Sequence, residues 1–304
     1  MKVVWLACRV PILCIAALGL AMTSCASPRS AKKPSALELT SASALASTLS
    51  PGQLEATQGA IVQVTRRVQA TLDMRATSDS QAATATAAAQ ANQLATETAI
   101  TQATAQAMAA AQASWPPILV DPFADNSLGW PVGRHEDEAL AITTMLSGGK
   151  YLWTVVDAKH SNSYWNLVPA NGRTFSDFYA KVKVEFIRGE QDGHYAYGLV
   201  FRHNNDDYGF FGLRNDGRFT VLAVFDTGIY QNIVLRSSAI RSGQANQIGV
   251  RAIGSDFVFE INDQPVWRLS EDFPPGEIGL GVEVMVKEAE AQAAFTDFEV
   301  FAPK

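Results

Sequence analysis

The chain has few cysteines, and all of them lie at one end. They are Cys8, Cys14 and Cys25, so residues 26–304 contain none. This part of the chain therefore cannot form a disulfide, a zinc site built on cysteine or a cysteine nucleophile. Export from the cell would permit disulfides, but the fold of these residues has to be stabilised by packing and hydrogen bonds.

Aromatic residues are absent from a long stretch of the chain. Residues 26–114 contain no Trp, Tyr or Phe, whereas these residues are frequent from Trp115 onward. Large aromatic side chains supply much of the buried area of a packed core, so the aromatic-free stretch is not expected to form one. The sequence predicts a single globular domain over residues 118–304, long enough to bury a core of its own.

A basic surface is also missing. Residues 119–304 hold 25 acidic and 16 basic residues, a net charge of −9, and residues 1–118 hold 5 acidic and 8 basic residues, a net charge of +3. Binding to nucleic acid requires lysines and arginines that neutralise phosphates. The composition therefore predicts that this domain binds no nucleic acid.

The first 24 residues have the pattern of an export signal. Lys2 and Arg9 precede a run of 13 apolar or small residues, Val10–Met22, which is short for a membrane-spanning helix of about 20 residues. Residues 22–25 (Met-Thr-Ser-Cys) then resemble the bacterial lipobox, with Met22 in place of the usual Leu. The resemblance implies that Cys25 becomes a lipidated N-terminus, anchored to a membrane at the cell surface or outer membrane. An ordinary secretory signal and a short membrane anchor are the alternatives.

Two segments of different composition follow. Residues 25–52 are rich in Ser, Ala and Thr and contain prolines, which predicts a flexible tether. Residues 53–114 contain no proline and, after Gly59, no glycine, which predicts a helical stalk. Its first part carries apolar residues at helical spacing: Leu54, Ile61, Val64, Val68 and Leu72. This stripe favours either a weak coiled coil with a second copy or a single helical spacer.

From residue 118 the pattern changes to short alternating segments separated by turn residues, as in antiparallel sheets. Gly148-Gly149, residues 215–217 (Asn-Asp-Gly) and Asn262-Asp263 are the clearest turn signals. The strands are expected at residues 139–146, 151–157, 178–186, 195–203, 208–214, 219–225, 229–235, 247–253, 257–261, 266–269, 278–286 and 291–301. The predicted fold is all-β, a two-sheet antiparallel β-sandwich (jelly roll), with a closed barrel as the alternative.

Several segments of this domain carry a resemblance to a known family. They are residues 121–130 (DPFADNSLGW), 197–202 (YGLVFR), 205–210 (NDDYGF), 279–282 (GLGV) and 295–300 (FTDFEV). Together they resemble the concanavalin A-like (laminin G-like) jelly rolls, in particular the 3-keto-disaccharide hydrolase-like domain family. The resemblance implies the fold and a preference for sugars, and it carries no catalytic residue onto this sequence.

Aromatic residues give the best indication of binding. An aromatic ring on a sheet surface can stack on the apolar face of a sugar, while a neighbouring polar group supplies hydrogen bonds. The candidates are Trp153, Trp165, Tyr195 and Tyr197, with Arg202 as the polar group. The alternative is that the rings fill the core and that Arg202 pairs with a carboxylate on a neighbouring strand.

Calcium is the one cofactor that the sequence suggests. Asn205, Asp206 and Asp207 are consecutive residues with side-chain oxygens, which are the ligands that calcium prefers. Laminin G-like domains often bind calcium, so the resemblance points the same way. The alternative is an ordinary turn between two strands, since Asn and Asp are common turn formers.

No catalytic motif stands out. The four histidines lack the His/Glu spacing of a zinc site, and neither a G-x-S-x-G motif nor a glycine-rich phosphate loop is present. A pair of carboxylates held about 5–10 Å apart would serve for glycoside hydrolysis. Four carboxylates lie in or beside predicted strands: Asp157, Glu185, Asp206 and Asp207. The sequence does not select a pair from them, so the catalytic residues stay undefined.

These observations favour a surface-anchored lipoprotein that presents a β-sandwich binding module, with carbohydrate as the expected ligand. A hydrolase acting on oxidised disaccharides or other glycans is the first alternative. A module for protein–protein interaction or envelope structure is the second.

Overall fold

The fold is that of a computed structural model, which describes residues 50–138, 140–158, 162–167, 172–189, 194–226, 228–285 and 290–304. Within these residues the chain forms one α-helix, α2 (Pro51–Gln112), followed by fifteen strands. The predicted signal peptide, Cys25 and nearly all of the predicted tether lie outside the described residues. Among the described residues, no helix combines the length and apolar character needed to cross a membrane.

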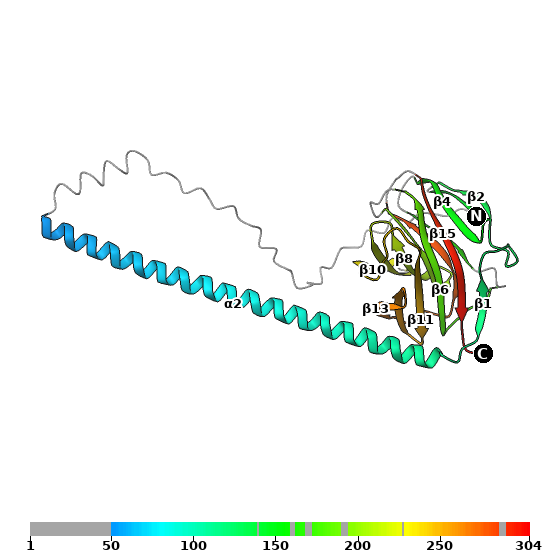
Figure 1. The fold of residues 1–304 in the computed structure, drawn as a ribbon, viewed down its shortest axis with the longest axis horizontal. Coiled ribbons are helices and arrows are strands. Elements are labelled where there is room, and N and C mark those ends of the chain that lie inside the picture. The colour runs from blue at the N-terminus through cyan, green and yellow to red at the C-terminus, as the bar shows by residue number, and fades with distance from the viewer. Residues whose placement is uncertain are drawn as a thin grey trace. The chain divides into compact units, whose positions relative to one another are not determined.

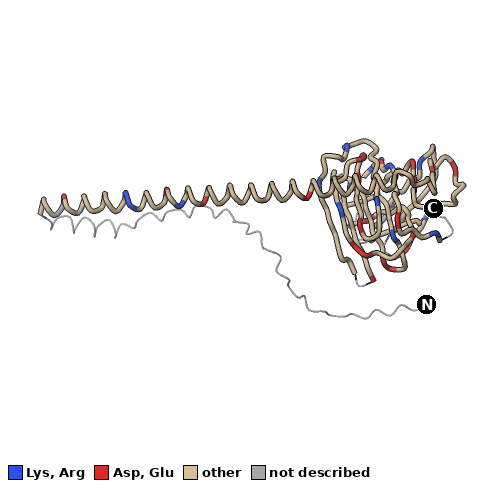
Figure 2. Tube along the Cα trace, turned by 90° about the horizontal axis from the view of Figure 1, so that it is seen from below, with Lys and Arg blue, Asp and Glu red and all other residues tan. Residues whose placement is uncertain are grey.

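Helix α2 belongs to both of the compact units into which the chain divides, residues 1–84 and 85–304. It contains much Ala and Gln, which favour helix, and charged residues are sparse along it (Figure 2). In the single chain the predicted apolar stripe is exposed: Ile61, Val64, Val68 and Leu72. Pairing of the stripe with a second copy stays a prediction.

The strands form two antiparallel sheets (Figure 1). The larger has nine strands in the order β13-β12-β11-β6-β15-β4-β3-β2, with β1 also paired to β15. They are β1 (Pro117–Asp121), β2 (Gly133–Glu136), β3 (Leu140–Ser147), β4 (Lys150–Ala158), β6 (Phe178–Arg188), β11 (Asn246–Ile253), β12 (Asp256–Ile261), β13 (Gln264–Ser270) and β15 (Ala291–Phe301).

The smaller sheet has six strands in the order β10-β9-β8-β7-β14-β5. They are β5 (Asn162–Leu167), β7 (Tyr195–Asn204), β8 (Asp207–Arg214), β9 (Arg218–Phe225), β10 (Gly228–Arg236) and β14 (Glu277–Val284). Two separate sheets confirm the predicted sandwich and exclude the closed barrel that the sequence left open.

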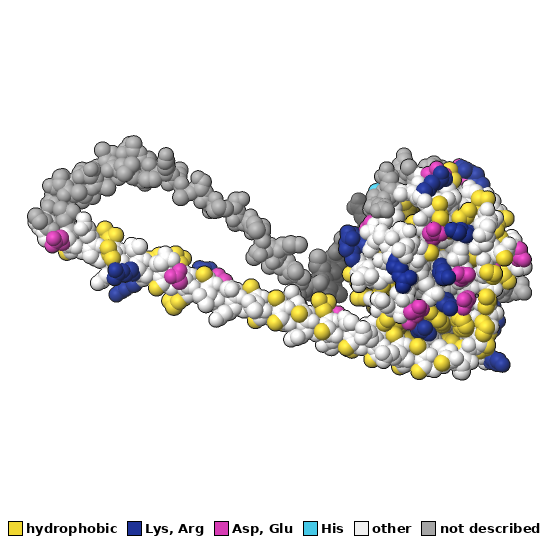
Figure 3. Space-filling view, in the orientation of Figure 1, with side chains coloured by type: hydrophobic (Ala, Val, Ile, Leu, Met, Phe, Trp, Pro, Cys, Tyr) yellow, Lys and Arg dark blue, Asp and Glu magenta, His cyan; other side chains and the backbone are white. Residues whose placement is uncertain are grey.

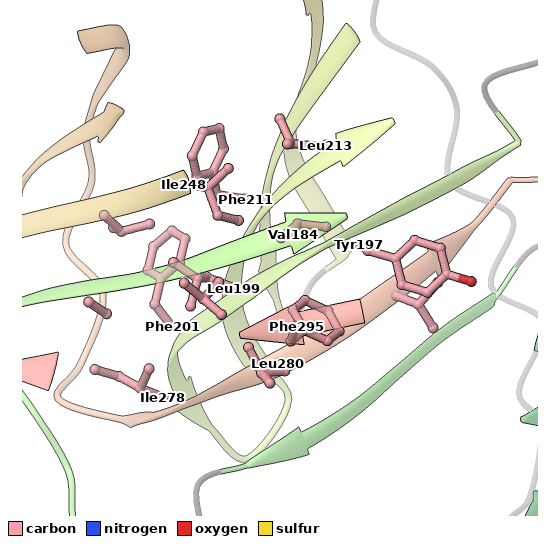
Figure 4. Close-up of a cluster of buried hydrophobic side chains, with 14 of the residues drawn as sticks. Val184, Tyr197, Leu199, Phe201, Phe211, Leu213, Ile248, Ile278, Leu280 and Phe295 are labelled. Atoms are coloured by element: carbon pink, nitrogen blue, oxygen red, sulfur yellow. The ribbon is translucent and has the colours of Figure 1, made fainter. Parts of the chain in front are cut away.

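One continuous core lies between the sheets. On β6, Phe178, Ala180, Val182 and Val184 are buried while the residues between them are more exposed, as the alternation of the sequence predicts. From the other sheet come side chains such as Leu199, Phe201, Phe211 and Leu280, which lie against Val184, Ile248 and Phe295 (Figure 4).

The predicted turns form where their residues tolerate a positive φ. Gly148 and Gly149 have φ of 58° and 70° and connect β3 to β4, with Ser147 paired to Lys150. Asn262 and Asp263 have φ of 51° and 63° and connect β12 to β13. Two consecutive residues with positive φ are typical of the two-residue hairpin turn whose twist matches that of the strands.

Three strands were not expected from the sequence: β1, β2 and β5. β5 reads Asn-Ser-Tyr-Trp-Asn-Leu, which lacks the alternation of apolar and polar residues used to recognise strands. It lies at the edge of the six-stranded sheet and pairs only with β14. Its identity as a strand depends on that partner, and it carries Trp165.

The last turns of α2 pack on the nine-stranded sheet, inside the unit formed by residues 85–304. Ala105 and Met108 are buried against Val258. Gln112 Nε2 donates to the carbonyl of Phe178 (3.1 Å), and Arg251 Nη1 donates to Gln112 Oε1 (2.9 Å). The helix end is therefore part of the folded domain, which extends beyond the predicted start at residue 118.

We expect a fragment of residues 118–304 to be less stable than one of residues 85–304. The shorter fragment uncovers Val258 and leaves the polar groups that Gln112 satisfies without their partner. Loss of a buried Met side chain alone costs about 2–5 kcal/mol, so the free energy of unfolding should fall by roughly 3 kcal/mol. Urea unfolding of both fragments measures this, and equal midpoints would contradict it.

Outside the part against which α2 packs, the outer face of the nine-stranded sheet carries charged side chains. Basic and acidic side chains are interspersed on this side of the domain (Figure 3). Three cross-strand ion pairs lie on it: Lys150–Glu185, Lys181–Glu299 and Lys183–Asp297. The two more exposed pairs, Lys150–Glu185 and Lys183–Asp297, are expected to contribute little to stability.

Candidate functional site

The outer face of the six-stranded sheet carries a second apolar cluster. Strands β7, β8 and β14 are buried along almost their whole length, on both faces. On the outer side a cluster forms from Ala196, Val200, Tyr208, Phe210 and Leu222, with Trp165, Leu167, Val224 and Met285 packed against it. Its core members are buried, and its partly exposed side chains, such as Trp165, make this face a candidate ligand platform.

A row of glycines crosses this cluster. Gly281 on β14, Gly198 on β7 and Gly212 on β8 are paired side by side, and Trp165 on β5 continues the row. A Cβ on Gly212 would lie 2.5 Å from the ring of Phe210, and a Cβ on Gly198 would lie 1.9 Å from a backbone oxygen. Only glycine fits at these positions, because neighbouring groups pack directly against the backbone. The floor of the platform is therefore closely packed.

Three rings, one each from β5, β7 and β8, lie close together on this face. The ring centroids of Trp165 and Tyr208 are 4.9 Å apart, and those of Trp165 and His203 are 5.4 Å apart. Trp165 and His203 are half-buried and Tyr208 is buried. Because Trp165 is packed by its neighbours yet keeps accessible surface, its ring is held in place and can still contact a ligand.

Beside the rings lies a buried carboxyl group. Glu283 on β14 is 8% exposed, and Ser163 Oγ donates to its Oε2 at 2.7 Å. Ser163 Oγ also lies 3.5 Å from Tyr208 Oη. Burial raises the pKa of Glu283 to about 7, although the Ser163 hydrogen bond opposes the shift. Burial, together with the Glu283 charge, raises the pKa of Tyr208 to about 12.

The raised pKa of Glu283 predicts a pH dependence of stability. Its ordinary value is 4.5 and its folded value about 7, so between these the folded state binds more protons than the unfolded state. Stability therefore falls as pH rises from about 4.5 to about 7, by roughly 3 kcal/mol for this one group. The Glu283→Gln variant should lack this contribution. Urea unfolding at pH 4.5 and pH 7.5 measures the free energy of unfolding of both proteins. A difference between wild type and variant that is the same at both pH values would contradict the assignment.

Chemically, this arrangement offers an aromatic face, two hydroxyl groups and a carboxyl group that changes its protonation near neutral pH. Hydroxylated ligands use such groups, since the ring packs on C–H groups and the polar atoms exchange hydrogen bonds with hydroxyls. Among the described residues, no cluster of three or more His, Cys, Asp or Glu side chains is placed to hold a metal ion.

Of the aromatic residues singled out from the sequence, only Trp165 lies on this face. Trp153, Tyr195 and Tyr197 are buried in the core between the sheets, and Tyr197 is seen there in Figure 4. Tyr197 Oη donates to the carbonyl of Ala291 at 3.2 Å. The structure thus gives these three rings the packing role that the sequence left open, because rings enclosed between two sheets have no surface to offer a sugar.

Arg202 has a structural role as well, and its partners differ from the predicted carboxylate. Its side chain is 2% exposed, and its guanidinium donates to the carbonyls of Phe273 (2.6 Å), Gly254 (2.9 Å) and Ser176. It has φ of 52° at an irregularity of β7. Arg202 therefore ties β7 to loops at one end of the sandwich and points away from solvent.

The residues proposed to hold calcium form the turn between β7 and β8. Asn205 has φ of 55°, and the Asp207 carboxylate accepts the backbone N–H of Asp226 at 2.9 Å. Both are ordinary features of a turn. Calcium binding by Asn205, Asp206 and Asp207 stays a prediction.

Sequence reasoning missed Glu283, Ser163 and Tyr208 as a group. One signal was available: Glu283 is the only charged residue inside the otherwise apolar and glycine-rich segment 278–284. Burial of a carboxylate in an apolar strand is unfavourable unless the group is hydrogen-bonded or paired. Such a residue therefore marks a candidate site. Its hydrogen-bond partner Ser163 lies 120 positions earlier, which only the pairing of β5 with β14 reveals.

No protein-family model matches the chain, and no curated protein matches it. Membership of the 3-keto-disaccharide hydrolase-like family therefore stays a prediction. Solved structures with a similar fold include a carbohydrate-binding module (CBM66) from Bacillus subtilis, with 15% identity, a TM-score of 0.43, and coverage of 58% of this chain and 98% of that one. A β-glucanase from Bacillus licheniformis has 7% identity, a TM-score of 0.47, and coverage of 63% and 100%. The laminarinase catalytic domain from Thermotoga maritima MSB8 has 9% identity, a TM-score of 0.45, and coverage of 62% and 99%.

Proposed function

We propose that this domain binds glycans on the outer face of its six-stranded sheet. The observation that carries the proposal is the half-buried Trp165 ring, held at 4.9 Å from Tyr208 and placed beside the Ser163–Glu283 pair. A sugar ring stacked on Trp165 would put its hydroxyls within reach of these polar groups.

The test is a glycan array probed with the full-length protein, with and without added calcium. Saturable binding to a group of related glycans, lost in Trp165→Ala, supports the proposal. Absence of binding across neutral and charged glycans would overturn it. A dependence on calcium that disappears in Asp206→Asn would support the predicted metal site separately.

A second candidate function, glycan hydrolysis, is favoured by one observation. Glu283 has a pKa raised to about 7, which is the state required of a general acid in this chemistry. The expected result for a hydrolase is release of reducing ends from a bound glycan, abolished in Glu283→Gln. Binding by the wild type with no product after long incubation would leave the domain as a binding module.

We further propose that the domain is displayed at the cell surface by lipid on Cys25. The supporting observations are the apolar run Val10–Met22 and the resemblance of residues 22–25 to a lipobox. The expected result is incorporation of labelled palmitate into the protein in bacterial cells, and its loss in Cys25→Ser. Equal labelling of the two proteins would contradict lipidation at this residue.

A further inference from the structure

One end of the sandwich contains a cavity. Its lining residues differ from those of the Trp165 platform. Its volume is about 150 Å³. Three segments surround it: the end of β6 (186–189), the β8–β9 hairpin (213–217) and the loop before β11 (240–246). None of the residues Trp165, Ser163, Tyr208 or Glu283 lines this cavity. We term it the end cavity.

The end cavity is lined by arginines, although the domain as a whole is acidic. Each of its three segments contributes one arginine, Arg188, Arg214 and Arg241, and no Asp or Glu among the described residues lines it. Arg188 pairs with Glu290, and Arg214 Nε lies 3.7 Å from Asp216 Oδ1. Within the described part of the chain, the Arg241 side chain makes no ion pair. Arg241 thus brings to the cavity lining a cation without a described carboxylate partner, and an anion bound there would be attracted to it.

The surroundings of Arg214 also favour the binding of an anion. Its side chain is only 13% exposed, and its Nε donates no hydrogen bond to any described residue. A buried donor without an acceptor is unfavourable. Asp216 does not supply the acceptor, because it lies beyond hydrogen-bond distance and is shared with Arg218, whose Nε is 3.4 Å away.

The loop that carries Arg241 is held in a fixed shape. Asn246 Oδ1 accepts the backbone N–H of Arg241 at 2.7 Å, while its Nδ2 donates to the carbonyls of Arg241 (3.0 Å) and Gln244 (2.9 Å). Asn246 itself is buried. Because the loop is already ordered, binding would not require an entropic cost for ordering it.

We propose that the end cavity binds the oxyanion of an acidic sugar, either the carboxylate of a uronate or a sulfate ester. Guanidinium groups bind both through paired N–H donors. A volume of about 150 Å³ is sufficient for a carboxylate or sulfate group, since about 10–15 Å³ of such volume already holds one water molecule. The choice of a sugar as the carrier of the anion rests on the proposed glycan-binding function, whereas the anion site itself does not involve Trp165.

Isothermal titration of the full-length protein tests this, with D-glucuronate, glucose 6-sulfate, inorganic sulfate and D-glucose as ligands. We expect one or both sugar anions to bind and glucose not to bind. The tighter of the two identifies the ligand as a uronate or a sulfated sugar. Binding of inorganic sulfate alone, or of none of the four ligands, would overturn the proposal.

Variants locate the binding. Arg241→Gln should weaken binding of the sugar anion at least tenfold, and it leaves the fold intact because Arg241 is exposed. Arg268→Gln removes an equally exposed arginine from β13 and should change nothing. Trp165→Ala should also leave this binding unchanged, which separates the end cavity from the proposed glycan platform. Equal affinities of wild type and Arg241→Gln would contradict the assignment.

Discussion

Replacement of Arg202 by Met should destabilise the domain by roughly 3 kcal/mol. The Met side chain fills part of the volume but donates no hydrogen bond. The carbonyls of Phe273 and Gly254 then lose the donors that reach them at 2.6 and 2.9 Å, and that of Ser176 loses its donor as well. Met also lacks the delocalised cation that Arg202 places 5.4 Å from the centre of the Phe257 ring. For a domain of this size the melting temperature should fall by about 10 °C.

Thermal unfolding followed by circular dichroism measures this effect. Arg134→Met is the matched control, since Arg134 pairs with Glu136 on β2 and its side chain is 51% exposed. We expect the control to change stability by less than about 0.5 kcal/mol. A fall of similar size in both variants would contradict the structural role of Arg202, and so would a stable Arg202→Met that has lost glycan binding.

Replacement of Trp165 by Ala should weaken glycan binding about 30-fold, the effect of removing one central aromatic anchor worth about 2 kcal/mol. The ring offers the sugar a flat apolar face, and its packing on Tyr208 and His203 means that little motion is lost on binding. Trp165 is also half-buried on an edge strand, so the variant should remain folded. Titration of wild type and variant with the best glycan from the array measures the ratio.

Tyr230→Ala is the control for this comparison. Tyr230 lies on β10 of the same sheet and is 66% exposed, so it is a more accessible ring than Trp165. It lacks the neighbouring Ser163–Glu283 pair. We expect its replacement to leave affinity within about twofold of wild type, which corresponds to roughly 0.4 kcal/mol. A larger loss for Tyr230→Ala than for Trp165→Ala would move the binding site to β10.

Much of the fold could be predicted because its signals are local. Alternation on β6 and the turn residues Gly148-Gly149 and Asn262-Asp263 each act over a few positions, and the structure agrees with them. β5 could not be found in this way. Its six residues become a strand only because β14 offers them an edge, and pairing between distant segments leaves no periodic trace in either segment.

The site was harder to predict because β7 is apolar on both faces. Tyr195 and Tyr197 do share a face, as the period of two requires, yet the alternate residues Ala196, Gly198 and Val200 are apolar as well. The sequence therefore does not say which set faces the core. The structure places the tyrosines in the core and the small residues under the outer cluster. The polar part of the site depends on register, because Glu283 meets Ser163 only in the observed pairing of β14 with β5.

The measurement that tests the central claim most directly is a crystal structure of the protein with the tightest-binding oligosaccharide from the array. We predict a sugar ring stacked on Trp165, with a hydroxyl hydrogen-bonded to Glu283 or Ser163. A sugar bound elsewhere on the domain, with the Trp165 face free, would contradict the account.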